Sequence, residues 1–213
     1  SDLVTGGVRL AREVCPAGKF VAGSVGPTGE IPAPYGSLDL KTGVDLFAEP
    51  IRILAREGVD LILIETMMSL EEAEMAVRAA REVCSLPVCM SMTFEVREGR
   101  VHSAYGVTPE QWVQAAMDWQ VAGVGANCGQ GFAEMVTVLK AFPAGVPVFA
   151  QANAGLPVQQ GTRWVYPDKP DTAKKWVEKL IALNPALIGG CCGTRPEHIR
   201  LIRTLVDAGD YDS

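Results

Sequence analysis

Histidine is scarce in this sequence, and its scarcity argues against a common kind of zinc chemistry. The 213 residues contain only two histidines, His102 in a predicted loop and His198 in the last predicted helix. Zinc sites that hydrolyse a substrate generally use histidine or carboxylate ligands. A hydrolytic zinc centre is therefore disfavoured.

Basic residues, long apolar runs and nucleotide-binding loops are lacking as well. The formal net charge of −6 argues against a nucleic-acid partner. No apolar run reaches the length of about 18 residues that spans a membrane, and residues 1–5 have no signal-peptide character. Gly26-Pro27-Thr28-Gly29 lacks the Lys-Ser/Thr ending of a phosphate loop. We expect a cytoplasmic protein that binds neither nucleic acid nor membrane.

The six cysteines include one informative pair. Cys191 and Cys192 are adjacent and flanked by glycines, and one peptide unit places their side chains poorly for a disulfide. Two thiolates at a glycine-rich strand end can instead bind one metal ion, and Cys128 ends another strand-like run. Three sulfurs with one vacant position predict a zinc site that activates an incoming ligand. A redox protein that uses the vicinal pair is an alternative.

The chain alternates apolar strands with amphipathic helices. The strands are apolar throughout, which is typical of a parallel sheet covered on both faces. Strands are predicted at 19–26, 59–66, 87–94, 123–128, 147–153 and 186–191. Helices are predicted at 5–14, 43–57, from Ser69, from Thr108, at 132–142, 171–183 and 196–208.

Two α/β architectures fit this pattern, an open doubly wound sheet and a closed (β/α)₈ barrel. The polar and sulfur-bearing residues favour the barrel, because they lie at the carboxyl ends of strands, which converge on one mouth in a barrel. A barrel has eight strands, and about six of the eight βα units are present. The residues at strand ends are Glu65, Thr66, Cys128, Asn153, Cys191 and Cys192.

The three-sulfur set predicts a particular reaction. Metal coordination deprotonates a thiol, and three protein thiolates make the metal centre electron-rich. A fourth, bound thiolate then stays nucleophilic, which is what alkyl transfer to sulfur requires. The other cysteines, Cys15, Cys84 and Cys89, are expected to be ordinary buried residues.

Four motifs together resemble the homocysteine S-methyltransferase family, which includes the homocysteine-binding module of cobalamin-dependent methionine synthase. The motifs are Gly189–Thr194, Asn127-Cys128, Gly23–Gly29 and Glu65-Thr66. The resemblance implies a (β/α)₈ barrel in which Cys128, Cys191 and Cys192 bind zinc. It also implies that Glu65 binds the α-amino group of homocysteine.

The chain departs from the family pattern at its start. The family begins with a strand that ends in Asp-Gly and a second strand that ends in an Asn-Thr-Phe-like motif, and neither occurs here. We expect residues 1–213 to form one barrel domain without its N-terminal βα units, with another chain as one source of the missing strands.

Several further residues are expected near the site. Asn127 precedes a cysteine and is expected to orient the metal ligands. Ser24, Thr66 and Asn153 are expected to line the substrate pocket because of their positions at strand ends. Trp164 and Tyr166 are expected to pack within a long loop rather than cover the mouth of the barrel.

The favoured hypothesis is zinc-dependent methyl transfer to homocysteine, giving methionine, with methylcobalamin on a corrinoid domain or protein as donor. S-methylmethionine or S-adenosylmethionine is the alternative donor. A non-catalytic zinc-binding module that needs a partner chain is the alternative from another functional class.

Overall fold

The structure is a computed structural model that describes residues 2–209. The chain divides into two compact units. Unit 1 contains residues 2–91 and 114–124, and unit 2 contains residues 92–113 and 125–209. Among the helices of residues 2–209, none has the length and apolar character needed to cross a membrane.

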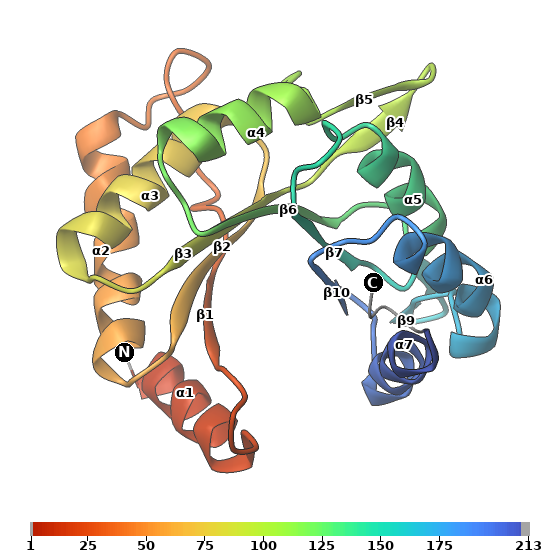
Figure 1. The fold of residues 1–213 in the computed structure, drawn as a ribbon. Helices are drawn as coiled ribbons and strands as arrows, with labels where there is room; N and C mark the ends of the chain where they lie inside the picture. Colours follow the sequence, from red (N-terminus) through yellow and green to blue (C-terminus); the bar gives the residue numbers. More distant parts are fainter. Residues whose placement is uncertain (1, 210–213) are drawn as a thin grey trace. The chain divides into compact units, whose positions relative to one another are not determined.

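Strands and helices alternate along the chain as predicted (Figure 1). All six predicted strands and all seven predicted helices are confirmed, with ends that differ by a few residues. The helices are α1 (Asp2–Val14), α2 (Leu40–Arg56), α3 (Leu70–Val83), α4 (Pro109–Asp118), α5 (Phe132–Lys140), α6 (Pro170–Ile181) and α7 (Pro196–Ala208). The predicted strands are β1 (Ala22–Val25), β2 (Leu61–Met67), β3 (Val88–Met92), β6 (Gly123–Cys128), β7 (Val148–Ala152) and β10 (Leu187–Gly190).

The strands follow the order of the chain within each unit. In unit 1, β1 pairs in parallel with β2, β3 follows β2, and the first residues of β6 come next. In unit 2, the rest of β6 is followed by β7, which pairs in parallel with β10. A doubly wound sheet would reverse its strand order at a switch point. The sequential order is that of a barrel-type fold.

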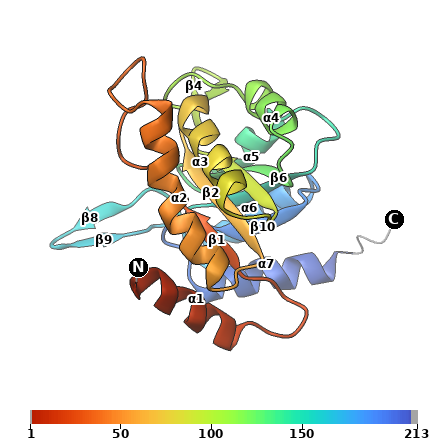
Figure 2. The ribbon, with the colours of Figure 1, turned by 90° about the vertical axis from the view of Figure 1, so that its left-hand side faces the viewer.

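The core of unit 1 forms where α2 and α3 pack side by side (Figures 1 and 2). The buried face of α2 includes Phe47 and Ile51, as its apolar spacing predicts. Ser69 caps α3 by accepting a hydrogen bond from the Glu72 amide at 3.2 Å. Gly43 allows the two helices to approach, because a Cβ at this position would collide with Met75.

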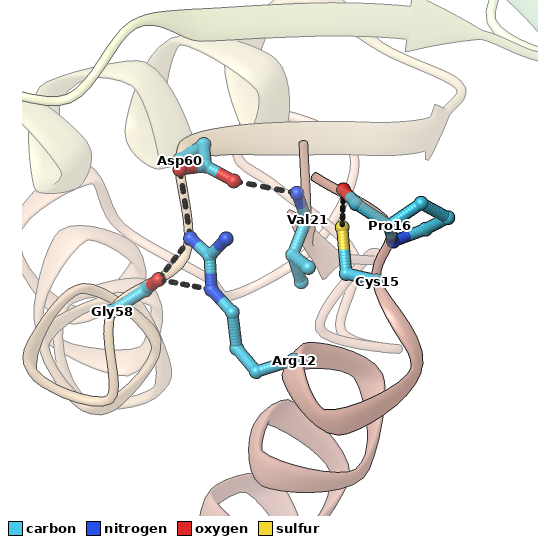
Figure 3. Close-up of polar contacts among 6 residues, drawn as sticks. All are labelled: Arg12, Cys15, Pro16, Val21, Gly58 and Asp60. Carbon is cyan, nitrogen blue, oxygen red and sulfur yellow. Dashed lines mark hydrogen bonds and ion pairs between the residues drawn. The ribbon is translucent and has the colours of Figure 1, made fainter. Parts of the chain in front are cut away.

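Arg12 connects helix α1 to the rest of unit 1 (Figure 3). Its guanidinium donates to the carbonyl oxygen of Gly58 at 2.8 Å and forms an ion pair with Asp60 at 2.7 Å. Asp60 also accepts a hydrogen bond from the Val21 amide at 2.6 Å. The Arg12 hydrogen bond, followed by that of Val21, lowers the pKa of Asp60 below its ordinary value.

Two short hairpins were not predicted. Strands β4 (Glu95–Arg97) and β5 (Arg100–His102) form one antiparallel pair, and β8 (Val158–Gln160) and β9 (Arg163–Val165) form the other. His102 therefore lies in a strand, and Trp164 lies in β9 rather than in an irregular loop. Figure 2 shows that the β8–β9 hairpin projects outward from the residues before and after it in the sequence. Strands of three residues with exposed polar side chains carry too little periodicity for recognition from sequence.

Candidate metal centre

Three cysteines meet at the carboxyl ends of strands in unit 2. Cys128 is the last residue of β6, and Cys191 and Cys192 follow directly after β10. Their sulfur atoms all lie within 4.8 Å of one another, and the Sγ atoms of Cys191 and Cys192 are 4.0 Å apart. Sulfurs bound tetrahedrally to zinc at about 2.3 Å would lie about 3.8 Å apart. The three sulfurs thus fit a zinc ion with little rearrangement.

The backbone after β10 turns so that both adjacent cysteines face Cys128. Strand β10 ends at Gly190, so the alternation of side chains along a strand no longer applies to Cys191 and Cys192. The Cys191 amide donates to Ala152 at 2.8 Å, and the Thr194 hydroxyl donates to the Cys191 carbonyl at 2.7 Å. Gly193 then adopts a left-handed φ of 76°. The chain therefore turns directly after the strand, at the glycine that follows the cysteine pair.

Two buried asparagines donate hydrogen bonds to the sulfurs. Asn127 Nδ2 lies 3.6 Å from Cys191 Sγ, and Asn153 Nδ2 lies 3.4 Å from Cys128 Sγ. Asn153 Oδ1 also accepts the Cys192 amide at 2.9 Å. Asn127 was expected to orient this site, whereas Asn153 was expected to line the substrate pocket. The structure places both against the cysteines.

The three cysteine thiols differ in pKa, so they do not ionise equally readily. The hydrogen bond from Cys128 is the main cause that lowers the pKa of Cys191 to about 6. The same bond, together with burial, raises the pKa of Cys128, and burial is the main cause that raises the pKa of Cys192. One thiolate therefore forms readily, while a second and a third would repel it. A bound cation would remove that repulsion and allow all three to ionise.

Tyr166 lies against the turn that follows the two adjacent cysteines, although it was expected to pack within a long loop. Burial is the main cause that raises the pKa of Tyr166, and the negative charge of the nearby Cys192 raises it further. Its ring covers Gly193, because a Cβ on this glycine would collide with the ring. A hollow of about 240 Å³ opens beside Tyr166 and Gly193. Nothing in the spacing of the sequence signals this contact.

His198 has a structural environment rather than a ligand's. Its Nδ1 accepts a hydrogen bond from the Arg195 amide at 3.1 Å, so Nε2 carries the proton and donates to the Asp168 carbonyl at 2.9 Å. The ring is buried and stacks on Phe132. Both ring nitrogens are thus engaged in hydrogen bonds to the backbone. Cys15, Cys84 and Cys89, which were expected to be buried, are half-buried instead.

A second polar group lies in unit 1 at the ends of β1 and β2. The hydroxyl of Ser24, in β1, donates to the Glu65 carboxylate in β2. Glu72 is buried and accepts both the Thr28 amide at 2.8 Å and the Thr28 hydroxyl at 2.7 Å. This pair fixes the loop that follows β1. The structure therefore brings Ser24 and Glu65 together, as their positions at strand ends predicted.

One residue near the cysteine cluster and one near the Ser24–Glu65 contact have an unusual backbone conformation. Thr66, near the end of β2, has a φ of 64°, and Cys128, at the end of β6, has a φ of 67°. A φ in this left-handed region is uncommon for any residue other than glycine, and for the β-branched Thr66 it is a genuine outlier. Such strain costs about 1–3 kcal/mol and clusters at functional sites.

Comparisons of the sequence with a family profile and with individual proteins point to the same family. A profile of the homocysteine S-methyltransferase family matches residues 1–206. Methionine synthase from Mycobacterium leprae (strain TN) is 31% identical over 197 residues, which cover 88% of this chain and 16% of that protein. Methionine synthase from Mycobacterium tuberculosis (strain ATCC 25618 / H37Rv) is also 31% identical, over 96% of this chain and 18% of that protein. The chain thus spans less than a fifth of these relatives.

Solved structures of the homocysteine methyltransferase MmuM from Escherichia coli share the fold. The apo form superposes with a TM-score of 0.70 at 22% identity, covering 96% of this chain and 72% of that chain. The metallated form gives a TM-score of 0.70 at 23% identity, covering 95% and 70%. The predicted (β/α)₈ barrel fold class is confirmed.

Proposed function

Because the chain belongs to the homocysteine S-methyltransferase family, we propose that it transfers a methyl group to the thiol of homocysteine, giving methionine. The observation that carries the proposal is the cluster of three cysteine sulfurs within 4.8 Å of one another. A set of three sulfurs leaves one tetrahedral position for a substrate thiolate.

Cys128, Cys191 and Cys192 are the proposed zinc ligands. When bound, zinc would supply the positive charge that keeps an incoming thiol ionised at neutral pH. The protein's own contribution is to hold the sulfurs in place, through the Asn127 and Asn153 amides and through the turn at Gly193. Cys192 is the exposed member of the three, so substrate approaches from its side.

Glu65 is the proposed partner of the substrate's α-amino group. Its carboxylate is half-buried and oriented by the Ser24 hydroxyl. A charge-assisted hydrogen bond from an ammonium to such a carboxylate is stronger than the same bond in water. Ser24, Thr66 and Asn153 are proposed to line the pocket.

The transfer step is a displacement at carbon. The substrate sulfur forms a bond to the methyl carbon, and the bond to the donor breaks with its electron pair leaving on the donor. No protein base acts in this step, because the attacking thiol is already ionised. The relatives are methionine synthases of which this chain matches a small part. They favour methylcobalamin on a separate corrinoid domain or protein as donor.

Additional strands are proposed to pair with the sheet. Within residues 2–209, β1 has a strand neighbour only in β2, and β10 only in β7. An edge strand presents unpaired amides and carbonyls that another strand can bind. The missing βα units, from this protein or a partner chain, are the proposed occupants.

The test is methyl transfer by the purified, zinc-loaded chain with homocysteine. Methylcobalamin, S-methylmethionine and S-adenosylmethionine are supplied in separate reactions, and methionine is measured by mass spectrometry. Turnover with one donor supports the proposal and identifies that donor. Stoichiometric zinc and a folded chain with no turnover for any donor, even with the missing βα segment added, would contradict it.

A further inference from the structure

The carboxylate of Glu134 binds two backbone amides that are far apart in the sequence. Glu134 lies in the first turn of α5. Its Oε2 accepts a hydrogen bond from the Gln130 amide at 2.7 Å, and its Oε1 accepts one from the Val96 amide at 3.3 Å. Gln130 lies two residues after the proposed ligand Cys128, and Val96 lies in β4. One carboxylate therefore joins the loop after β6 to the β4–β5 hairpin.

The loop that Glu134 holds has an unusual backbone conformation. Cys128, Gly129 and Gly131 have left-handed φ values of 67°, 70° and 127°. Glycine adopts this region freely, whereas cysteine does not. A Cβ on Gly129 would lie 3.1 Å from Glu134 Oε2, so the carboxylate rests against the backbone of the residue after Cys128. The loop therefore needs contacts from neighbouring elements to keep Cys128 in this conformation.

Asn153 and Glu134 bind different groups of this loop. Asn153 donates from Nδ2 to the Gly129 carbonyl at 2.8 Å and from its backbone amide to the Cys128 carbonyl at 3.3 Å. These bonds engage carbonyl oxygens, whereas Glu134 engages the amide that follows, that of Gln130. The two side chains together therefore hold both kinds of backbone group in the loop.

The position of Glu134 in α5 suits this role. The N-cap of α5 is Gly131, which has no side chain to accept an amide. Glu134 is the third helical residue, the position from which a carboxylate reaches back to the chain before a helix. A negative charge in the first turn is favoured by the helix dipole, and an ionised acceptor makes a stronger hydrogen bond than a neutral one. The half-buried side chain is thus a stable anchor for the loop.

We propose that Glu134 is a positioning residue for the metal centre, because its carboxylate holds the loop after β6 in the conformation that presents the Cys128 sulfur to the ion. The inference rests on the proposed function, in which Cys128 is a zinc ligand. Loss of the carboxylate frees the Gln130 amide and allows the backbone at Cys128 to relax toward an extended φ. That change would turn the Cys128 sulfur away from Cys191 and Cys192.

Amide hydrogen exchange in the metal-free protein, followed by NMR, tests the hydrogen bonds directly. We expect Glu134→Ala to speed exchange at Gln130 about 10- to 100-fold, the loss of a hydrogen bond to a charged group. A smaller increase is expected at Val96, whose bond is longer. Glu110→Ala removes an exposed carboxylate from the first turn of α4 and is expected to match the wild type at both amides. An unchanged rate at Gln130 in Glu134→Ala would overturn the inference.

Zinc affinity, measured by competition with a chromophoric chelator, tests the effect on the metal ligand. Glu134→Ala is expected to weaken zinc binding about 10- to 100-fold, whereas Glu110→Ala should bind zinc as the wild type does. In a Cys128→Ala background the same Glu134 substitution should change the affinity about twofold or less, because Glu134 acts through Cys128. The full loss in that background would show that Glu134 only stabilises the fold, and would overturn the inference.

A milder variant keeps the test decisive if Glu134→Ala does not fold, as judged by circular dichroism. Glu134→Gln keeps one acceptor oxygen and loses the other. We expect its zinc affinity to lie between those of the wild type and Glu134→Ala, or about tenfold below the wild type if the alanine variant is unfolded. Wild-type affinity in Glu134→Gln together with wild-type exchange at Gln130 would contradict the inference. Wild-type protein that binds zinc but makes no methionine would count against the proposed function alone, because neither measurement needs turnover.

Discussion

The Asn153 amide lies 3.4 Å from the sulfur of Cys128, and this contact connects the ends of two neighbouring strands. The same side chain accepts the Cys192 amide at 2.9 Å through its oxygen. One buried asparagine thus links β6 with the turn after β10. Its amide donates to one proposed ligand and its oxygen fixes the backbone of another. The cluster is therefore held in place before any ion binds.

Replacement of Asn153 with aspartate is expected to weaken zinc binding about 10- to 100-fold, the range for residues that orient metal ligands. The change keeps the shape but replaces the donor to Cys128 with a negative charge. Competition with a chromophoric chelator measures the dissociation constant. Asn184→Asp, in the turn after α6, is the matched control and should bind zinc as the wild type does. An unchanged affinity in Asn153→Asp would show that the contact does not orient the ligand.

Glu65→Gln is expected to raise KM for homocysteine about 10- to 100-fold, the loss of one hydrogen bond between charged groups. The change removes charge but little volume. Zinc content should stay that of the wild type, because Glu65 is not a proposed ligand. Steady-state kinetics with a saturating methyl donor provide the measurement. A fall in kcat with KM unchanged would assign Glu65 a different role.

Gly43→Ala is expected to destabilise the protein by about 1–3 kcal/mol, the usual cost of overpacking. The added methyl group collides with Met75 where α2 meets α3. Urea unfolding measures the free energy. Gly7→Ala in α1 is the matched control, since no atom lies within 4 Å of its added Cβ. That control should raise stability by up to about 1 kcal/mol through helix propensity. Equal effects of the two substitutions would contradict the close approach of α2 and α3.

The Arg12–Asp60 pair predicts a dependence of stability on pH. The folded pKa of Asp60 is lower than its ordinary value of 3.8. The pair therefore stabilises the fold above about pH 4 and loses this effect as the pH falls through the folded pKa. Asp60→Asn should lower the unfolding midpoint at pH 7 and converge with the wild type in strong acid. Asp45→Asn, which removes an exposed pair with Lys41, should have a smaller effect at pH 7. A constant difference between Asp60→Asn and wild type at all pH values would show that Asp60 titrates normally.

The sequence predicted the strands, their helices and the meeting of the three cysteines, because apolar runs and strand-end positions are local signals. Ser24 and Glu65 were also brought together as expected, since their strands are neighbours in a parallel sheet. The packing of Tyr166 over Gly193 escaped prediction because it depends on how the chain folds back after an exposed hairpin. The two hydrogen bonds of Asn153 escaped prediction for a similar reason, because one of them depends on the turn after β10, 39 residues further along the chain.

X-ray absorption at the zinc edge of freshly reduced, zinc-loaded protein would show whether the three cysteines bind the ion. We expect three sulfur neighbours at about 2.3 Å, and four after homocysteine is added. Cys128→Ser should lower the sulfur count, whereas Cys84→Ser should not. A zinc shell made of nitrogen and oxygen, or no bound zinc after reconstitution, would show that Cys128, Cys191 and Cys192 do not form a zinc site.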